Sequence, residues 1–193
     1  MFDTHAFKAL RPCAFAAAAL LAACGGGSDG GPDHGAIPAS MHIGADVDGT
    51  AVMVTTVVEG WWGENVSYPD DPPYAYLSAG EDSDSDSPAL TDRSWQIYVR
   101  DPEPGSTHEC AKGDAVIVRF LDGARDAADK PFTTTFFSAY KGLGECTVTI
   151  ESVSDGEISG RFTATAKDGD TGATREITNG TFRVPAATGP EPA

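Results

Sequence analysis

Cys110 and its neighbours are the residues of this chain whose types best suit chemistry. His108 and Glu109 stand directly before Cys110, and a second thiol, Cys146, follows further along the chain. A histidine beside a cysteine can activate a thiolate nucleophile, and a histidine with two thiols can bind zinc. The chain has no CxxC or HxxxH spacing, which zinc sites usually have. A nucleophilic cysteine and a zinc site therefore stand as alternatives to a disulfide between the two cysteines.

A run of alternating aspartates offers a second kind of chemistry. Asp82, Asp84 and Asp86 alternate with serines, as at the start of a Ca²⁺-binding EF-hand loop. Such a loop needs Gly at its sixth position and a bidentate Glu at its twelfth, where this chain has Ser87 and Arg93. These departures favour a solvated acidic loop and leave a looser Ca²⁺ site as the alternative.

Aromatic residues near carboxylates are typical of carbohydrate sites. Trp61 and Trp62 stand at the end of an expected strand, and Tyr68 and Tyr74 follow in a Pro-rich stretch. Because adjacent residues of a strand point to opposite faces, the core can bury only one of the two indole rings. We expect either that a sugar stacks on the other ring, or that both rings cover a loop and the edge of the fold.

The sequence carries no signature of a known catalytic site. It has no GxSxG, no HExxH and no phosphate-binding loop. A carboxylate pair that hydrolyses glycosides is the alternative, but a chain with 29 Asp and Glu residues forms such pairs by chance. We therefore expect a protein that is not an enzyme and that has no cofactor, with Ca²⁺ as the one alternative.

The N-terminal segment predicts where the protein goes. Lys8 and Arg11 precede the apolar run Cys13–Ala23, which is shorter than a membrane-spanning helix. The run ends in Leu21-Ala22-Ala23-Cys24, which resembles the lipobox of bacterial lipoproteins. This resemblance implies cleavage before Cys24 and lipidation of that cysteine, and an ordinary cleaved signal peptide is the alternative.

The lipobox divides the chain into parts. We expect a signal peptide at residues 1–23, a lipidated cysteine and Gly-rich flexible tether at 24–40, a folded domain at 41–185 and a disordered tail at 186–193. Several acyl chains make membrane attachment effectively stable. In the enteric sorting pattern, Gly25 in place of Asp implies the outer membrane. The protein is therefore expected in the cell envelope, facing the periplasm or the outside.

Export also bears on the remaining cysteines. Cys13 leaves with the signal peptide and Cys24 carries lipid, so Cys110 and Cys146 remain as a pair in an oxidising compartment. A structural disulfide between them is therefore the favoured prediction.

Charge limits the partners of the protein. Its formal net charge is -16, from 13 Lys and Arg against 29 Asp and Glu. Nucleic acid is excluded as a partner, because phosphate binding needs clustered basic residues. No Lys or Arg lies between Arg11 and Arg93, so the acidic first half could attract Ca²⁺ or a cationic partner, or could serve solubility alone.

The pattern of the folded domain predicts strands. Apolar residues alternate with polar ones in short runs bounded by Gly, Pro, Asn and Asp, and almost no run has a helical period. About nine strands in series indicate an all-β, antiparallel β-sandwich or a barrel-like fold. They are Met41–Val47, Thr50–Val58, Tyr74–Ala79, Ser94–Arg100, Ala115–Leu121, Phe132–Tyr140, Cys146–Val153, Glu157–Ala166 and Glu176–Val184.

Two C-terminal runs each place a glycine two residues before a phenylalanine. Gly160 precedes Phe162, and Gly180 precedes Phe182, which predicts a bulge or a close approach of backbones. Together with an opening Asp48-Gly49-Thr50 turn, these runs resemble a family of small, uncharacterised bacterial lipoproteins. The resemblance implies a β-sandwich and no known activity.

These expectations combine into one hypothesis. The protein is expected to be a lipid-anchored envelope protein whose domain is a non-enzymatic binding or accessory module with an unidentified ligand. A domain that binds Ca²⁺ or carbohydrate through the loops of residues 61–92 is one alternative, and a hydrolase with a carboxylate pair is the other.

Overall fold

The chain divides into two units, Met1–Asp33 and His34–Ala193, in the computed structural model. The structure describes residues 36–63, 73–81, 89–112, 116–154 and 156–188, which all belong to the second unit. The expected signal peptide and most of the tether lie outside these residues.

The described residues form β-strands and one short 3₁₀ helix, η1. In chain order they are β1 His42–Val47, β2 Thr50–Val54, β3 Val58–Gly63, β4 Tyr74–Gly80, β5 Thr91–Arg100, β6 Thr107–Glu109, η1 Cys110–Lys112, β7 Val116–Ala124, β8 Thr133–Ala139, β9 Glu145–Ser154, β10 Glu157–Asp168, β11 Thr174–Pro185 and β12 Ala187–Thr188. Every strand predicted from the sequence overlaps one of these, so the all-β prediction is confirmed.

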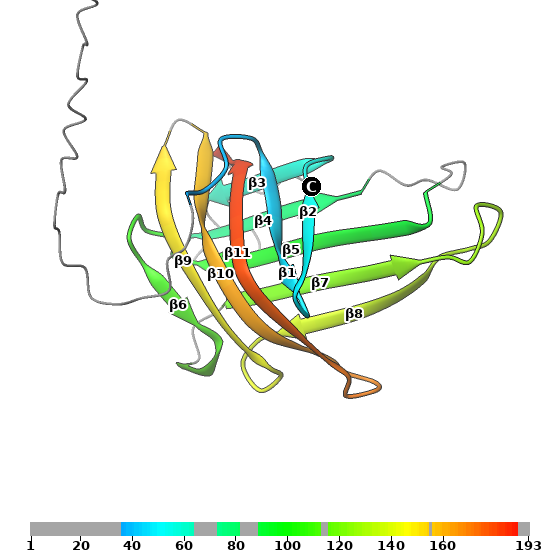
Figure 1. Ribbon diagram of the computed structural model, residues 1–193. Helices are drawn as coiled ribbons and strands as arrows, with labels where there is room; N and C mark the ends of the chain where they lie inside the picture. The colour runs from blue at the N-terminus through cyan, green and yellow to red at the C-terminus, as the bar shows by residue number, and fades with distance from the viewer. Residues whose placement is uncertain (1–35, 64–72, 82–88, 113–115, 155, 189–193) are drawn as a thin grey trace, which may run out of the picture. The chain divides into compact units, whose positions relative to one another are not determined.

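Two groups of antiparallel strands make up the fold. One group runs β3, β4, β5, β7, β8, and the other runs β9, β10, β11, β1, β2, with β6 paired to the outer edge of β9. In Figure 1 the strands of the first group lie behind those of the second and run across them. The inner faces of the two groups therefore meet as crossed layers.

Two junctions turn these layers into a nearly closed barrel. Strand β10 pairs with β9 along most of its length, but Lys167 and Asp168 at its end pair with β8. On the other side, the chain that leaves β11 forms β12, which runs parallel to β3. The predicted disordered tail at 186–193 is therefore wrong for its first residues, because Ala186 is buried and β12 pairs with β3. Residues 189–193 lie outside the described residues.

The core lies between the layers and is formed by alternate residues of each strand. Trp95 of β5 is fully buried, with its ring centroid 4.6 Å from that of Phe120 and 5.4 Å from that of Phe162. Ile158 and Phe162 of β10 are buried on the inward face of this strand. Burial of these apolar side chains supplies the hydrophobic free energy that holds the layers together.

Gly160 and Gly180 confirm the predicted close approach of backbones. In the pairing of β10 with β11, Gly160 lies opposite Phe182 and Gly180 lies opposite Phe162. A Cβ atom on Gly160 would lie 2.5 Å from the Phe182 ring, and one on Gly180 would lie 2.7 Å from the Phe162 ring. Each phenylalanine therefore occupies the space that a side chain on the opposite glycine would need. The register of this strand pair shifts just after Phe162, as at a bulge.

Hairpin turns join β1 to β2 and β10 to β11. Asp48, with φ of 49°, and Gly49, with φ of 78°, join β1 to β2. Between β10 and β11, the Asp168 carboxylate accepts backbone hydrogen bonds from Asp170 at 2.8 Å and Thr171 at 2.9 Å. The backbone hydrogen bond from Thr171, and then that from Asp170, lower the pKa of Asp168. The turn is thus stabilised by a carboxylate that stays ionised.

Candidate binding site at one end of the barrel

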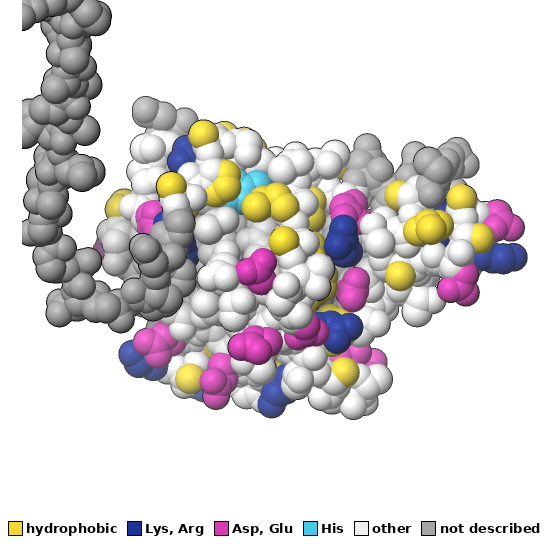
Figure 2. Space-filling model, viewed as in Figure 1, with side chains coloured by type: hydrophobic (Ala, Val, Ile, Leu, Met, Phe, Trp, Pro, Cys, Tyr) yellow, Lys and Arg dark blue, Asp and Glu magenta, His cyan; other side chains and the backbone are white. Residues whose placement is uncertain are grey.

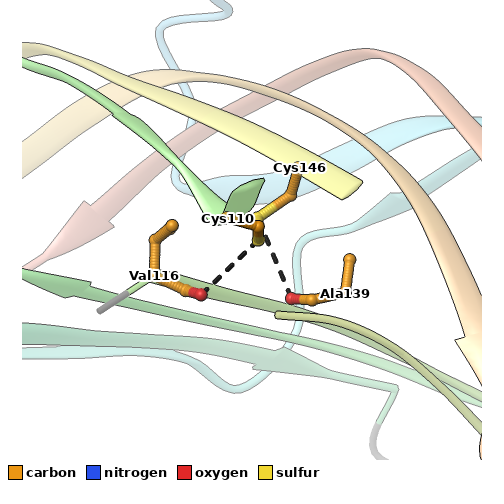
Figure 3. Close-up of a disulfide and its surroundings, with 4 residues drawn as sticks. All are labelled: Cys110, Val116, Ala139 and Cys146. Atoms are coloured by element: carbon orange, nitrogen blue, oxygen red, sulfur yellow. Dashed lines mark hydrogen bonds between the residues drawn. A yellow bond between two sulfur atoms is a disulfide. The ribbon is translucent and has the colours of Figure 1, made fainter. Parts of the chain in front are cut away.

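The predicted disulfide between Cys110 and Cys146 is confirmed. Cys110 begins η1, Cys146 is the second residue of β9, and their Cα atoms are 5.1 Å apart. The Cys110 sulfur lies 3.5 Å from the Val116 carbonyl oxygen, and the Cys146 sulfur lies 3.8 Å from that of Ala139 (Figure 3). Neither sulfur of a disulfide carries a proton, so Cys110 is not a thiolate nucleophile or a zinc ligand in this state.

His108, in β6, forms a hydrogen bond with the residue that precedes this strand. Its Nε2 lies 2.9 Å from the Ser106 hydroxyl oxygen. Within the described ranges, no group of three or more His, Cys, Asp or Glu side chains is placed to hold a metal ion. Asp82, Asp84 and Asp86 lie outside the described residues, so a Ca²⁺ site there stays a prediction. Cys24 lies outside them too, and its lipidation also stays a prediction.

Arg93 occupies the position at which an EF-hand has its bidentate glutamate, and it binds Glu81 instead. Its Nη2 lies 2.7 Å from Glu81 Oε1, and its backbone N–H donates to Oε2 at 2.9 Å. Burial acts to raise the pKa of Glu81, but the hydrogen bonds and the charge of Arg93 outweigh burial and lower that pKa. Glu81 is therefore held as an ion-paired carboxylate.

Carboxylates of the first half of the chain are partly balanced by polar groups of the second half. Asp48 accepts a hydrogen bond from Arg175 at 3.2 Å, and Asp46 accepts one from Asn179 at 2.8 Å. Arg175 also lies 3.7 Å from Asp122. Figure 2 shows basic side chains interspersed with acidic ones on this face of the molecule. Folding thus evens out part of the charge asymmetry seen along the sequence.

Trp61 and Trp62 lie on opposite faces of β3, as the alternation of a strand requires. Trp61 is on the outer face, where its ring centroid lies 4.8 Å from that of Tyr74; each residue is only 6% exposed. Tyr74 in turn lies 4.8 Å from Tyr98. The structure therefore brings two of the four predicted aromatic residues, Trp61 and Tyr74, into contact. Tyr68 lies outside the described residues.

Trp62 points to the inner face and lines a pocket of about 350 Å³. The pocket lies where β3, β5 and β11 end and the β9–β10 hairpin turns, which is one end of the barrel. Its apolar lining comes from Trp62, Pro102, Pro104, Val153 and Ala186. Barrel ends with an apolar lining and a few polar groups are where small ligands commonly bind.

Two carboxylates complete this pocket, which we call the barrel-end pocket. Glu103 is exposed in the loop between β5 and β6, and Glu157 is half-buried at the start of β10. Glu157 accepts a hydrogen bond from Arg183 Nη1 at 2.6 Å. Arg183 also donates to the Pro38 carbonyl oxygen at 3.1 Å. One pocket carboxylate is therefore neutralised within the fold, whereas Glu103 has no ion pair with any described residue.

The walls of the barrel-end pocket are held by backbone hydrogen bonds. The Gly105 N–H donates to the Ile150 carbonyl at 2.7 Å, and the Ile150 N–H donates to the Ser106 carbonyl at 2.9 Å. The Ala186 N–H donates to the Gly156 carbonyl at 2.6 Å, which ties the end of β11 to the β9–β10 hairpin. The loop after β5 and the hairpin are thus fixed before any ligand arrives.

A second hollow, of about 260 Å³, lies beside the disulfide on the outer face of β9, β10 and β11. It is lined mainly by threonine hydroxyls and by the carboxylates of Glu109, Glu145 and Glu176. Glu109 is paired with Lys112 at 2.7 Å. None of its described lining residues is aromatic, so the barrel-end pocket is the better candidate for a small ligand.

Among the residues of the barrel-end pocket, only Trp62 belongs to a motif that stands out in the sequence. Pro102, Glu103, Val153 and Glu157 come from segments far apart in the chain, and no spacing connects them. Comparison of the chain with protein-family models, with curated proteins and with solved structures found no match. No helix in the described part of the chain is long and apolar enough to cross a membrane.

Proposed function

We propose that this chain is a lipid-anchored protein of the cell envelope whose barrel acts as a non-enzymatic binding module. The lipobox-like segment before Cys24 supports an anchor in the outer membrane, with the barrel facing the periplasm or the outside. The disulfide between Cys110 and Cys146 supports an oxidising compartment.

The observation that carries the binding role is the barrel-end pocket itself. It combines an aromatic side chain, Trp62, with apolar neighbours and two carboxylates, in walls fixed by hydrogen bonds. Such a pocket can bind a ligand without first ordering its own loops, which lowers the entropic cost of binding.

Carbohydrate binding is the second candidate, and it draws on the same pocket. The ring of Trp62 could stack on a sugar, while Glu103 and Glu157 accept hydrogen bonds from its hydroxyls. Carbohydrate binding and the binding of another kind of small ligand at this pocket are distinguished by which compounds bind.

The anchor is tested by replacing the expected lipidation site. We expect Cys24→Ser to move the protein from the membrane fraction to the soluble fraction, because the acyl chains can no longer be attached. Cys13→Ser, within the expected signal peptide, is the matched control and should leave the protein in the membrane fraction. Unchanged fractionation of Cys24→Ser would contradict the anchor.

The binding role is tested by thermal shift on the full protein purified from membranes in detergent. Neutral sugars, organic amines, organic acids and Ca²⁺ form the panel, and at least one class should raise the Tm. Ser154→Trp, which places a large ring in the barrel-end pocket, should abolish that shift, whereas Thr133→Trp, on an exposed position of β8, should not. A panel without any shift, or a shift that survives Ser154→Trp, would refute binding at this pocket.

A further inference from the structure

We propose that the barrel-end pocket binds a small organic cation, in which an ammonium group is carried on an apolar framework. This inference rests on the proposed binding function and names the class of ligand. It follows from the charge, the surface and the size of the pocket.

The charge of the lining favours a cation. Among the described residues that line the pocket, Glu103 and Glu157 are the charged ones, and none is Lys, Arg or His. Arg183 compensates Glu157 at 2.6 Å, which leaves the charge of Glu103 uncompensated by the described residues. The charge of Glu103 would repel an anionic ligand and attract an ammonium group.

The surface of Trp62 favours an apolar framework next to the ammonium group. The residue is half-buried, and its indole Nε1 is buried with no hydrogen-bond partner among the described residues. What Trp62 presents to the pocket is therefore the carbon surface of its ring. An indole face attracts cations through its quadrupole, and Pro102, Val153 and Ala186 add apolar surface around it.

Size limits the ligand to a small molecule. A volume of about 350 Å³ is near the lower end of the range for ligand pockets. Backbone hydrogen bonds hold the loop after Glu103, because Ser106 donates its N–H to the Glu103 carbonyl at 2.9 Å and Gly105 donates its N–H to the Ile150 carbonyl at 2.7 Å. The loop that carries Glu103 and the end of the strand that carries Trp62 thus line one small space.

Calorimetric titration of the detergent-purified full protein tests this inference with three probes that share one ring. They are 2-phenylethylammonium, neutral 2-phenylethanol and anionic phenylacetate, each with a blank titration into detergent alone. We expect the ammonium probe to bind about tenfold more tightly than the alcohol, and phenylacetate to bind most weakly. High salt should weaken binding of the ammonium probe, because it screens the attraction to Glu103.

Two variants separate the pocket from the overall charge of the protein. Glu103→Gln should lower the affinity for the ammonium probe about tenfold and leave the affinity for the alcohol unchanged. Glu145→Gln removes one negative charge at the other end of β9 and should leave the affinities for both probes unchanged. Because Glu103 is exposed and outside the core, its variant should keep the parental Tm.

Other outcomes would overturn the inference. Equal affinity for the ammonium probe and the alcohol, or equal effects of the two glutamine variants, would remove the case for a cation. If the alcohol or a neutral sugar still binds and Ser154→Trp abolishes that binding, the binding module stands and only the ligand class is wrong. If no probe and no compound of the thermal-shift panel binds, the inference and the proposed function fail together.

Discussion

Gly160 has no side chain, and the ring of Phe182 on the paired strand β11 occupies the space that a side chain would need. The same relation recurs between Gly180 and Phe162 a few residues away. Both phenylalanines are buried in the core, so these glycines are needed for close packing and not only for chain flexibility. A glycine-to-alanine change should therefore have very different effects at different positions of this fold.

Gly160→Ala should destabilise the protein by about 1–3 kcal/mol, because the new methyl group would collide with the Phe182 ring and the Thr149 carbonyl oxygen. Gly169→Ala is the matched control, since a Cβ there would have no atom within 4 Å. Urea unfolding followed by tryptophan fluorescence measures both variants. Equal free energies of unfolding for the two variants would refute the packing role of Gly160.

Glu81 should make the protein sensitive to acid. Burial opposes ionisation of Glu81, but Arg93 outweighs burial and lowers the pKa of Glu81 in the folded state. The ion pair therefore stabilises the protein at pH values above the unfolded-state pKa, near 4.5. This stabilisation is lost as the pH falls through the lower pKa of the folded state. The Tm measured between about pH 3 and 7 should fall less steeply on acidification for Glu81→Gln than for the parent. The Glu81→Gln variant should keep some acid sensitivity, because the pKa of Asp168 is also lowered in the folded state. Identical Tm profiles would contradict the role of the pair.

The strands were predictable because their alternation is local, but one boundary was not. The run Thr50–Val58 reads as one strand, whereas the structure ends β2 at Val54 and begins β3 at Val58. The break contains Val57 with φ of 44°, a left-handed conformation that a β-branched residue rarely adopts. No Gly, Asn or Pro marks this turn, so the sequence carries no signal for it.

Val57→Gly should raise the free energy of unfolding by about 0.5–1 kcal/mol, because relief of the left-handed strain outweighs the added backbone entropy. Val57 is 52% exposed, so little packing is lost. Thr55→Gly, two residues earlier at a position without positive φ, should instead lower it by about 0.5–1 kcal/mol. Loss of stability in both variants, measured by urea unfolding, would show that Val57 is not strained.

The segment of β6 and η1 is connected to β9 by the disulfide. Replacing Cys110 and Cys146 together by alanine should lower the free energy of unfolding by about 4 kcal/mol, the chain-entropy value for a sequence separation of 36 residues. Cys24→Ser, outside the barrel, is the control and should leave the unfolding free energy unchanged. A loss below about 1 kcal/mol in the double variant would show that the bridge is dispensable for stability.

At the scale of the whole molecule, the fold brings together what the sequence keeps apart. The barrel-end pocket combines Trp62, Glu103, Val153 and Ala186 from separate strands and loops. The aromatic pair at positions 61 and 62 could be recognised from the sequence, and alternation correctly placed the two rings on opposite faces. The carboxylates beside Trp62 could not be recognised, because strand pairing and barrel closure decide which loops meet at one end.

The mass of the intact mature protein, taken from membranes without a reducing agent, is the decisive measurement for export and lipidation. We expect a chain that starts at Cys24, carries acyl groups there and has no free thiol. The anchor and the oxidising compartment both depend on that result, because both follow from export. A chain that retains Met1 to Ala23, with an unmodified Cys24 and free thiols at Cys110 and Cys146, would contradict it.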